Sequence, residues 1–261
     1  MEYIKRGMKK DREKILEVKN LTKDYGSGPI LDGISFDVHR GEVIVIVGPS
    51  GCGKSSLLRC MNGLESIQSG SIYLDGVDIT FEKTNWSMVR KKVGMVFQNY
   101  DLFPHMTVIN NLILGPSKVH KEKKEDIKKR AELLLERVGL LNKKDVYPRE
   151  LSGGQKQRVA IVRALMMKPE VLLFDEVTAA LDPEMVREVL DVMLELATSG
   201  STMLIVTHEM QFARAVADKV IFIENGKIIE EDEAERFFNE PKTERAYQFL
   251  NTFKFERGER V

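Results

Sequence analysis

The hydrophobic pattern of this chain changes along its length. Apolar and polar residues alternate over residues 15–21 and 34–38, which predicts antiparallel strands with one solvated face. Residues 43–47, 171–174 and 202–206 are instead apolar almost throughout, as in parallel strands that are buried on both faces. The chain therefore predicts an antiparallel edge sheet near the N-terminus and a parallel sheet built from distant segments.

Helices and turns are expected to connect these strands. A helix is expected over residues 54–61, and another over residues 183–197 joins two of the apolar strands in a β-α-β unit. Further strands are expected at residues 71–79 and 93–97. A hairpin with its turn at Glu224-Asn225-Gly226 follows.

The segment from about residue 99 to residue 164 has helical periods. Within residues 121–137 and just beyond, the positions predicted to share one helix face are Ile127, Leu133, Leu134 and Val138. We interpret the segment as a helical subdomain inserted into the α/β core. No internal repeat is found, so residues 15–261 are expected to form one domain, which ends in a helical segment over about residues 233–261. The charged residues 1–14 are expected to form a solvated tail.

Composition narrows the class of protein. The 261 residues include 40 basic and 40 acidic side chains, so no net field would gather nucleic acid, and no nucleic-acid partner is expected. The two cysteines, Cys52 and Cys60, form no disulfide framework and suit a reducing compartment. No window approaches the roughly 20 apolar residues that span a bilayer, so a membrane role would have to come through a partner.

The sequence after residues 43–47 matches the P-loop spacing of glycine, four residues, glycine, lysine and serine. Its residues are Gly48, Pro49, Ser50, Gly51, Cys52, Gly53, Lys54 and Ser55. Such a loop turns backbone N–H groups towards phosphate oxygens, while the lysine reaches the β and γ phosphates and the serine holds Mg²⁺. The alternative is a glycine loop that merely starts a helix, but strand, loop and helix all fit the motif. Cys52 is either a thiolate favoured by the helix dipole or an inert side chain.

Two carboxylates end the apolar strand at residues 171–174. Asp175 and Glu176 would emerge at the carboxyl edge of a parallel sheet, where α/β proteins bind ligands. Because neighbouring strand residues point in opposite directions, one carboxylate can hold Mg²⁺ while the other activates water as a general base.

A second glycine-rich segment, Leu151-Ser152-Gly153-Gly154-Gln155, lies between the P-loop and this carboxylate pair. Together the motifs resemble the nucleotide-binding subunit of ABC transporters, from about Ile15 to the C-terminus. The resemblance implies a P-loop NTPase (RecA-like) α/β core with an antiparallel β subdomain and an inserted α-helical subdomain. It also implies ATP hydrolysis with Mg²⁺ by a head-to-tail homodimer that forms on ATP binding. Each ATP would lie between one P-loop and the other chain's residues 151–155, called here the signature segment.

The resemblance also gives roles to single residues. The expected metal ligands are Ser55, Gln98 and Asp175, and the expected catalytic residues are Glu176 as general base, His208 at the γ-phosphate, Gln98 at the lytic water, and Lys54. ATP is expected to contact Tyr25, which stacks on adenine, and Ser56 in addition to the P-loop. The partner chain's ATP is expected to contact Ser152, Gly153, Gly154 and Gln155, and Asp182 lies in a D-loop that spans the two subunits.

Simpler interpretations exist for some of these residues. Tyr25 could pack on its own hairpin, Asp182 could cap the helix that begins at Pro183, and Ser152 could cap the helix that follows it. His208-Glu209 suggests a zinc helix, but position 212 is phenylalanine where the second histidine is required. A metalloprotease is therefore excluded.

One position departs from the family pattern. Val177 follows the expected base where the family usually has proline, which would fix the backbone. We expect a competent ATPase with a slower turnover, and an unchanged turnover in Val177→Pro would contradict the second part of that expectation.

Residues 97–108, Thr207-His208-Glu209-Met210 and Phe212-Ala213-Arg214 resemble the polar amino acid uptake subfamily, which contains importers of the glutamine, arginine and histidine type. This implies transmembrane permease subunits as partners and, indirectly, a solute-binding protein. It implies a peripheral place at the cytoplasmic face of the cell membrane. In this family the permease's coupling helices meet the face around Gln98.

The alternative function is a mechanical ABC ATPase of DNA repair, chromosome organisation or translation. Chromosome proteins of this kind carry a long coiled coil between P-loop and signature, whereas here Leu151 follows Lys54 by 97 positions. Translation factors usually carry two cassettes, and this chain holds one. A regulator that does not hydrolyse ATP would be expected to lack the base, but Glu176 is present.

Overall fold

The computed structural model describes residues 12–26, 28–80, 84–119 and 122–253. The strands are β1 (Lys14–Asp24), β2 (Pro29–His39), β3 (Val43–Val47), β4 (Ser69–Leu74), β5 (Val77–Asp78), β6 (Val93–Val96), β7 (Val171–Asp175), β8 (Thr202–Val206), β9 (Lys219–Glu224) and β10 (Lys227–Glu233). The helices are α1 (Lys54–Met61), α2 (Trp86–Lys92), α3 (Val108–Val119), α4 (Lys124–Arg137), α5 (Gly153–Leu165), α6 (Pro183–Thr198), α7 (Met210–Val216), α8 (Ala234–Asn239) and α9 (Glu244–Asn251), with 3-10 turns at Leu141–Lys143 and Pro148–Glu150.

The strands form two sheets, as the sequence predicts. The antiparallel sheet has the order β2-β1-β4-β5, and the larger sheet has the order β10-β9-β3-β8-β7-β6. In the larger sheet β9, β3, β8, β7 and β6 are parallel, and only the edge strand β10 is antiparallel. The β-α-β unit of β7, α6 and β8 and the β9–β10 hairpin are confirmed, since β7 pairs with β8 in parallel and β9 with β10 in antiparallel.

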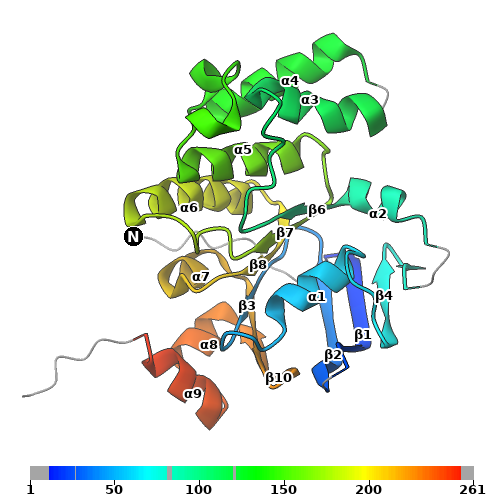
Figure 1. The fold of residues 1–261 in the computed structure, drawn as a ribbon. Helices are drawn as coiled ribbons and strands as arrows, with labels where there is room; N and C mark the ends of the chain where they lie inside the picture. The colour runs from blue at the N-terminus through cyan, green and yellow to red at the C-terminus, as the bar shows by residue number, and fades with distance from the viewer. Residues whose placement is uncertain (1–11, 27, 81–83, 120–121, 254–261) are drawn as a thin grey trace, which may run out of the picture.

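The larger sheet is buried on both faces. On one face, Ile44 and Ile46 belong to a core with α1 and the antiparallel sheet. On the other face, Val43, Val45 and Val47 belong to a core with α6, α7, α8 and α9. These layers flank β3 in Figure 1. The alternation of β3 side chains between two cores explains why the strand is apolar at every position.

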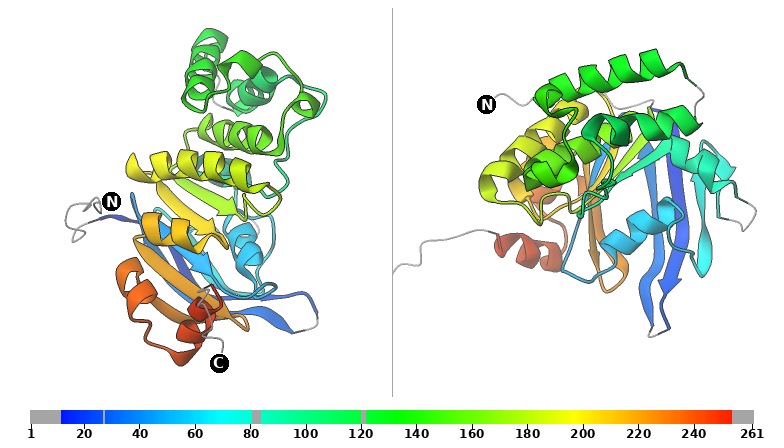
Figure 2. Two further views of the ribbon diagram at one scale, coloured as in Figure 1. Left: turned by 90° about the vertical axis from the view of Figure 1, so that its left-hand side faces the viewer. Right: turned by 45° about the horizontal axis from the view of Figure 1, so that its top comes forward.

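The helices α3, α4 and α5 form a lobe at one end of the molecule (Figure 2). The lobe has a hydrophobic core of its own, in which Leu112 of α3 and Ile127 of α4 pack with Val159 of α5. Helix α5 also contributes Ala160 and Ile161 to the core under the larger sheet. Because its residues belong to two cores, α5 connects the lobe to the body of the protein.

The chain enters the lobe through two consecutive residues of left-handed backbone, Tyr100 with φ 61° and Asp101 with φ 50°. Such residues cost conformational energy and persist only where their surroundings hold them. Here the Arg163 guanidinium of α5 donates to the carbonyl oxygens of both residues. The chain leaves the lobe through another left-handed residue, Lys168, with φ 53°.

The C-terminal segment, expected to be helical from about residue 233, contains two helices in the structure. Strand β10 continues to Glu233, and α8 and α9 follow as separate helices. Pro241 lies between them and cannot continue a helix, because it lacks an N–H group and restricts the residue before it. The buried Glu230 carboxylate accepts hydrogen bonds from the backbone N–H groups of Lys242 and Thr243, which fixes the break.

One position predicted to lie on the buried face of a helix is exposed instead. Leu133 is 62% exposed, whereas Ile127, Ala131 and Leu135 form the buried face of α4. Position 133 lies six residues after Ile127, about 240° around the helix, and therefore outside that face. Arg12 donates to the Gly41 carbonyl oxygen and Lys14 begins β1, so the end of the expected tail contacts the body. Residues 1–11 of that tail, Lys121 and residues 254–261 lie outside the described residues.

Candidate active site

The P-loop connects β3 to α1, as the motif requires. Gly48 has φ 150°, and a Cβ atom built there would lie 2.0 Å from the Ile223 carbonyl oxygen of β9, so only glycine allows this close approach. Lys54 is the first residue of α1 and is buried. Its Nζ donates to the carbonyl oxygens of Gly48 (2.9 Å) and Pro49 (2.8 Å). The loop therefore closes around the lysine ammonium group.

Ser55 and Asp175 meet directly. The Ser55 hydroxyl donates to Asp175 Oδ1 at 2.6 Å, although 120 positions separate the two residues. Asp175 is buried, and this burial raises the pKa of its carboxyl group, while the hydrogen bond from Ser55 and the charge of Arg59 act in the opposite direction. Arg59 Nη2 lies 3.8 Å from Asp175 Oδ2. A hydroxyl beside a carboxylate is the kind of hard oxygen donor set that Mg²⁺ prefers, so these residues fit a Mg²⁺ ion.

Glu176 leaves the strand rather than continuing it. Its φ is 47°, in the left-handed region, and its N–H donates to the Val206 carbonyl oxygen of β8. This backbone turn directs the carboxylate towards His208, whose Nε2 lies 3.2 Å from Glu176 Oε1. The sequence argument used strand alternation to separate Asp175 from Glu176, whereas the structure separates them by a change of backbone conformation. Val177, which follows, is buried in the core beneath the larger sheet.

The register of the larger sheet places the other expected residues along the same edge. Val96 of β6 pairs with Phe174, and Asp175 pairs with Val206 of β8. Gln98 therefore follows β6 next to the end of β7, as predicted. Its side chain is exposed and makes no hydrogen bond to any residue that the structure describes. The free chain thus brings Lys54, Ser55, Asp175, Glu176 and His208 together and leaves Gln98 directed to solvent.

Tyr25 lies beside α1. Its hydroxyl is 3.1 Å from Ser56 Oγ and also donates to the Glu65 carboxylate. Burial, followed by the hydrogen bond to Glu65, raises the pKa of Tyr25. Tyr25 is still 56% exposed as a residue, and Lys23 Nζ lies 4.7 Å from the centroid of its ring. Tyr25 therefore contacts the helix after the P-loop and does not pack on its own hairpin alone. Its exposed surface leaves room for a ligand to stack on the ring.

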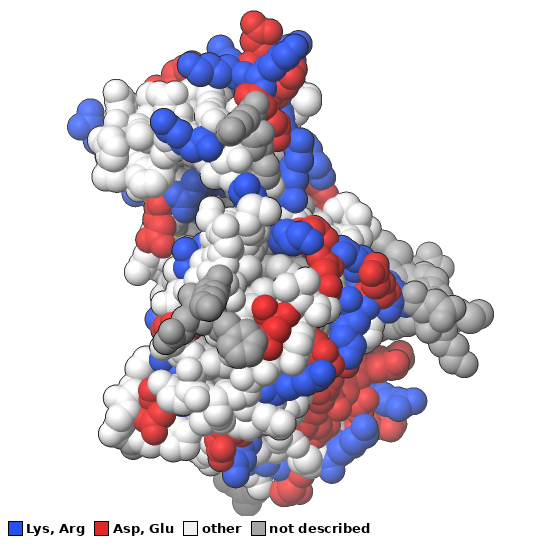
Figure 3. Space-filling model, turned by 90° about the vertical axis from the view of Figure 1, so that its right-hand side faces the viewer, with Lys and Arg blue, Asp and Glu red and all other residues white. Residues whose placement is uncertain are grey.

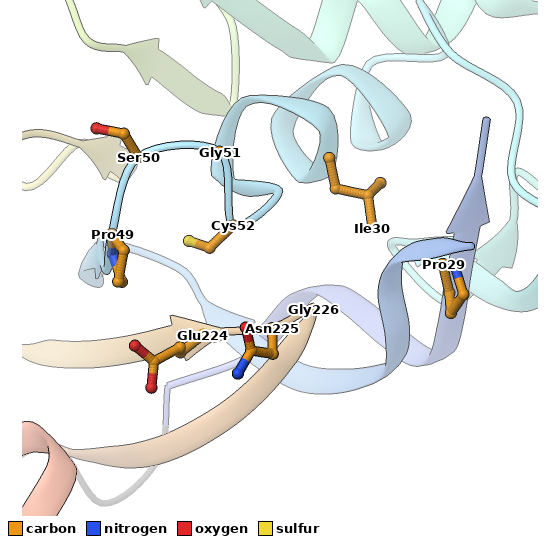
Figure 4. Close-up of a pocket in the computed structure, with 9 residues that line it drawn as sticks. All are labelled: Pro29, Ile30, Pro49, Ser50, Gly51, Cys52, Glu224, Asn225 and Gly226. Atoms are coloured by element: carbon orange, nitrogen blue, oxygen red, sulfur yellow. The ribbon is translucent and has the colours of Figure 1, made fainter. Parts of the chain in front are cut away.

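A small cavity of about 240 Å³ adjoins the P-loop. Ser50, Gly51 and Cys52 line one side, and Asn225 and Gly226 of the β9–β10 turn line the other (Figure 4). Cys52 is nevertheless buried, and burial raises the pKa of its thiol. Of the two interpretations of Cys52, the inert side chain is therefore favoured, because loss of solvation outweighs the favourable charge of Lys54.

The signature segment begins α5. Ser152 Oγ accepts from the Gln155 N–H (3.3 Å), and Gln155 Oε1 accepts from the Ser152 N–H (3.1 Å), so the two residues form a capping box. The Gly154 N–H donates to Met185 Sδ of α6 at 3.3 Å. Among the described residues, no hydrogen bond or ion pair connects the signature segment with the P-loop. Within the described part of one chain, the two glycine-rich segments are therefore not joined to each other by hydrogen bonds.

Asp182 occupies the N-cap position of α6, as expected for a residue before Pro183, but its side chain makes no capping hydrogen bond. The simpler interpretation of this residue is therefore only half right. The Asp182 carboxylate is exposed and could contact another molecule.

Sequence reasoning missed several residues around the site. Arg59 approaches Asp175, Met185 contacts Gly154, and the fully buried Gln157 donates from Nε2 to the Phe97 carbonyl oxygen. The capping box had a readable signal, serine followed three residues later by glutamine. The others had none, because each contact joins segments far apart in the chain.

A second hollow lies on the lobe. It has a volume of about 510 Å³ and a mostly apolar lining that includes Phe103, Leu114, Gly115 and Met167, with Lys118 and Arg163 beside them. We call it the lobe groove. Arg163 lines this groove, and burial lowers the pKa of its guanidinium group. Elsewhere the surface is mixed, and in Figure 3 both signs of charge occur over the lobe and over the lower part of the molecule.

The described residues contain neither a membrane-spanning helix nor a ready-made cluster of metal ligands. None of their helices is both long and apolar enough to cross a membrane. They contain no group of three or more His, Cys, Asp or Glu side chains arranged to hold a metal ion. The Ser55–Asp175 pair is thus a site of a different kind, in which a bound ligand would have to complete the coordination.

Comparison with known proteins gives consistent matches. A family model described as "ABC transporter" matches residues 31–179. The glutamine transport ATP-binding protein GlnQ of Bacillus subtilis is 52% identical over 237 residues, which cover 91% of this chain and 98% of the relative. The glutamate/aspartate import ATP-binding protein GltL of Escherichia coli K12 is 52% identical over 236 residues, or 90% of this chain and 98% of the relative. The arginine transport ATP-binding protein ArtM of Bacillus subtilis is 51% identical over the same shares.

Solved structures match over most of the chain. CbiO1 of Clostridium perfringens, part of the ABC transporter complex cbiONQ, has a TM-score of 0.78 and 33% identity, covering 92% of this chain and 96% of that one. A dimeric post-hydrolysis structure of the ATP-binding cassette MJ0796 with ADP and Pi has a TM-score of 0.76 and 31% identity, covering 84% and 99%.

Proposed function

Since the chain belongs to the ABC transporter family of ATP-binding proteins, we propose that it is the ATP-hydrolysing subunit of an importer for polar amino acids. One observation carries the ATPase part. The P-loop, the Ser55–Asp175 pair and the Glu176–His208 pair all lie at the carboxyl edge of the parallel sheet, where such folds bind ligands. The import of amino acids is supported by relatives that are about half identical over 90% of the chain and are named for glutamine, glutamate/aspartate and arginine transport.

In the proposed reaction, Glu176 acts as a general base. Its carboxylate takes a proton from water as the water oxygen attacks the γ-phosphorus, and ADP and phosphate leave. His208, 3.2 Å from the carboxylate, orients the base and contacts the γ-phosphate. Lys54 is buried at the first turn of α1, where its charge and the helix N-terminus stabilise the phosphate oxygens. Gln98 would turn from solvent towards the water once the site is filled.

Magnesium is proposed as the metal cofactor, held by Ser55 and Asp175. The ion would neutralise charge on the β and γ phosphate oxygens. In the free chain the Ser55 hydroxyl donates to Asp175 Oδ1. On metal binding, Ser55 Oγ would turn from this hydrogen bond to the cation. Ser55 Oγ and Asp175 Oδ1 are close enough to bind one cation together.

The proposed active form is a head-to-tail homodimer. Among the described residues of one chain, no hydrogen bond connects the signature segment with the P-loop, and the N–H groups of the segment would fit the ATP of a second chain. The residues proposed to bind that ATP are Ser152, Gly153, Gly154 and Gln155, with Asp182 beside the subunit boundary. Dimeric structures of a similar cassette support this arrangement. Tyr25, with its exposed ring, is proposed to stack on adenine.

The proposed membrane partner is a permease that docks in the lobe groove. The groove is mostly apolar and lies next to Asp101 and Phe103, in the segment that resembles amino acid importers and follows Gln98. A helical segment of the partner with an apolar face would suit it. The subunit would then be peripheral at the cytoplasmic face of the membrane and would serve a solute-binding protein indirectly. A mechanical ATPase of DNA repair or translation is not favoured, because the relatives that match nearly the whole chain are transport subunits.

A membrane pull-down with two matched variants tests this function. The tagged chain is expected to recover a permease from detergent-solubilised membranes of its own cells. Leu114→Glu places a charge in the lobe groove and should abolish that recovery without lowering basal ATP hydrolysis. Leu133→Glu places the same charge at an exposed position of the same lobe and should change neither property. Recovery of ribosomes or DNA without any membrane protein would overturn the transport role.

The amino acid cargo needs a separate measurement. Uptake of labelled polar amino acids is expected to fall in cells that lack the chain, and to return with the wild-type chain but not with Leu114→Glu. Unchanged uptake of every polar amino acid tested would contradict the proposed cargo while leaving the ATPase assignment intact.

A further inference from the structure

The N–H group of Gly154 is already occupied in the free chain. Gly154 is the second residue of α5, and its N–H donates to the thioether sulfur of Met185 at 3.3 Å. Met185 lies in the first turn of α6, three residues after Asp182. The contact therefore connects the signature segment with the start of the helix that follows the D-loop, within a single chain.

The N-terminal N–H groups of α5 can be accounted for one by one. The Gln155 N–H donates to Ser152 Oγ, and the Gly154 N–H donates to Met185. The Gly153 N–H makes no hydrogen bond to the described residues. Helix N-termini bind anions through such groups. An incoming phosphate thus finds one group open and one held by a sulfur atom.

The fold brings Met185 so close because position 154 has no side chain. A Cβ atom built on Gly154 would lie 2.9 Å from Met185 Cβ and 3.3 Å from its Cγ. A Cβ atom on Gly153 would lie 3.0 Å from a Leu181 methyl group and 3.1 Å from the Tyr100 hydroxyl. The two glycines therefore lie against the D-loop region of their own chain, and Met185 is half-buried there.

We propose that Met185 is a positioning residue for the signature segment, which holds the Gly154 N–H in the free chain and releases it to a phosphate oxygen of the partner chain's ATP. This inference rests on the proposed function, because it requires the ATP-bound dimer. A thioether is a weak acceptor, whereas an ionised phosphate oxygen forms a shorter and stronger hydrogen bond. The exchange is therefore favourable but not free, and Met185 sets the ATP concentration at which the dimer closes.

Two substitutions at position 185 change the acceptor in opposite directions. Met185→Leu keeps a similar volume and removes the acceptor, so the dimer should form at a lower ATP concentration. Met185→Gln offers an amide oxygen, a stronger acceptor, so the dimer should need more ATP. A single hydrogen bond predicts a change of about two- to tenfold in each direction.

The experiment measures ATP-dependent dimerisation by sedimentation in a Glu176→Gln background, so that hydrolysis does not empty the site. Met193→Leu, on the same helix but buried away from the signature segment in the core, is the matched control and should behave as the background chain. ATP binding to the chain's own P-loop, measured at protein concentrations that keep it monomeric, should be equal in all four proteins. In ¹⁵N-glycine spectra without nucleotide, the Gly154 amide resonance should move in both position-185 variants and stay in place in Met193→Leu.

The outcomes separate the inference from the function on which it rests. The role of Met185 is supported if the ATP concentration needed for dimerisation rises from Met185→Leu through the background chain to Met185→Gln while the affinity of the P-loop for ATP stays unchanged. Equal requirements in all variants, or weaker dimerisation in Met185→Leu, would overturn it while the dimer mechanism stands. Absence of an ATP-dependent dimer in every protein would overturn the proposed function and this inference with it.

Discussion

Glu176 Oε1 and His208 Nε2 lie 3.2 Å apart, across a sequence distance of 32 residues. Neither residue is inside a strand. Glu176 stands in left-handed backbone after β7, and His208 follows β8 by two positions. Because β7 and β8 are neighbours in the sheet, the fold alone brings the two side chains together, before any nucleotide is bound.

Glu176→Gln should bind ATP but lose the general base. We expect turnover to fall by at least about a hundredfold, and the ATP-bound dimer to accumulate with ATP and Mg²⁺ on a sizing column. Glu209→Gln, the same change at the carboxylate directly after His208, is the control and should keep most activity. A Glu176→Gln chain that stays strictly monomeric would contradict the mechanism.

Ser152 has two roles that can be separated by substitution. Ser152→Ala should lose the cap and destabilise the protein by about 1 kcal/mol, and it should also impair dimerisation with ATP. Ser152→Asp should keep the cap, since aspartate is an equally good N-cap residue, but place a negative charge where the partner's phosphate is proposed to bind. Urea unfolding should therefore separate alanine from aspartate, while sedimentation with ATP should find both defective. Normal dimerisation of Ser152→Asp would place the phosphate elsewhere.

The cysteine thiols should react slowly in the folded chain. Burial raises the pKa of Cys52 and raises that of Cys60 to about 12, and the thiolate is the reactive form. At mildly alkaline pH, iodoacetamide should modify neither residue quickly, whereas both should react in urea. Intact mass spectrometry gives the count, and Cys60→Ala isolates Cys52. Rapid modification of Cys52 in the native protein would restore the thiolate hypothesis.

A charge network at the opposite edge of the sheet predicts a pH effect on stability. Arg40 Nη1 lies 2.7 Å from Glu170 Oε2, Lys92 Nζ lies 3.1 Å from Glu170 Oε1, and both cations also contact Asp75. The hydrogen bond from Arg40 is the main cause that holds the pKa of Glu170 below its ordinary value of 4.5. Because this folded-state pKa is depressed, the stabilisation is present above about pH 4.5 and is lost as the pH falls through the folded value.

Glu170→Gln tests that network. At about pH 7 the variant should be less stable than the wild type by about 1 kcal/mol or less, since the groups are partly exposed. The difference should shrink as the pH falls below 4.5, the ordinary value, because Glu170 then becomes neutral in both states. Glu136→Gln, at an exposed carboxylate without an ion pair in the described structure, should show no such trend. A difference that is constant with pH would assign the effect to packing instead.

The sequence predicted the parts of this protein that depend on local pattern. The span of β3, the P-loop and the first turn of α1 were predicted because apolar runs and glycine spacing are read directly from neighbouring residues. The left-handed backbone of Glu176 and the Arg163 contacts were not, since both depend on segments that meet only in the folded chain. The division of the C-terminal helical segment into α8 and α9 was not predicted, because the contacts of Glu230 that fix the break join residues on either side of it in the folded chain. Both interpretations of Cys52 stayed open at the level of the sequence, because a helix dipole is visible there and desolvation is not.

Helix α5 has a mechanical consequence. Its 13 residues make a rod about 20 Å long, with the signature segment at one end and Arg163, beside the lobe groove, near the other. A displacement at the groove would therefore be transmitted to Gly153 and Gly154 along a single helix and not through loops. If binding of the permease changes the affinity of the chain for ATP by some factor, binding of ATP must change its affinity for the permease by the same factor.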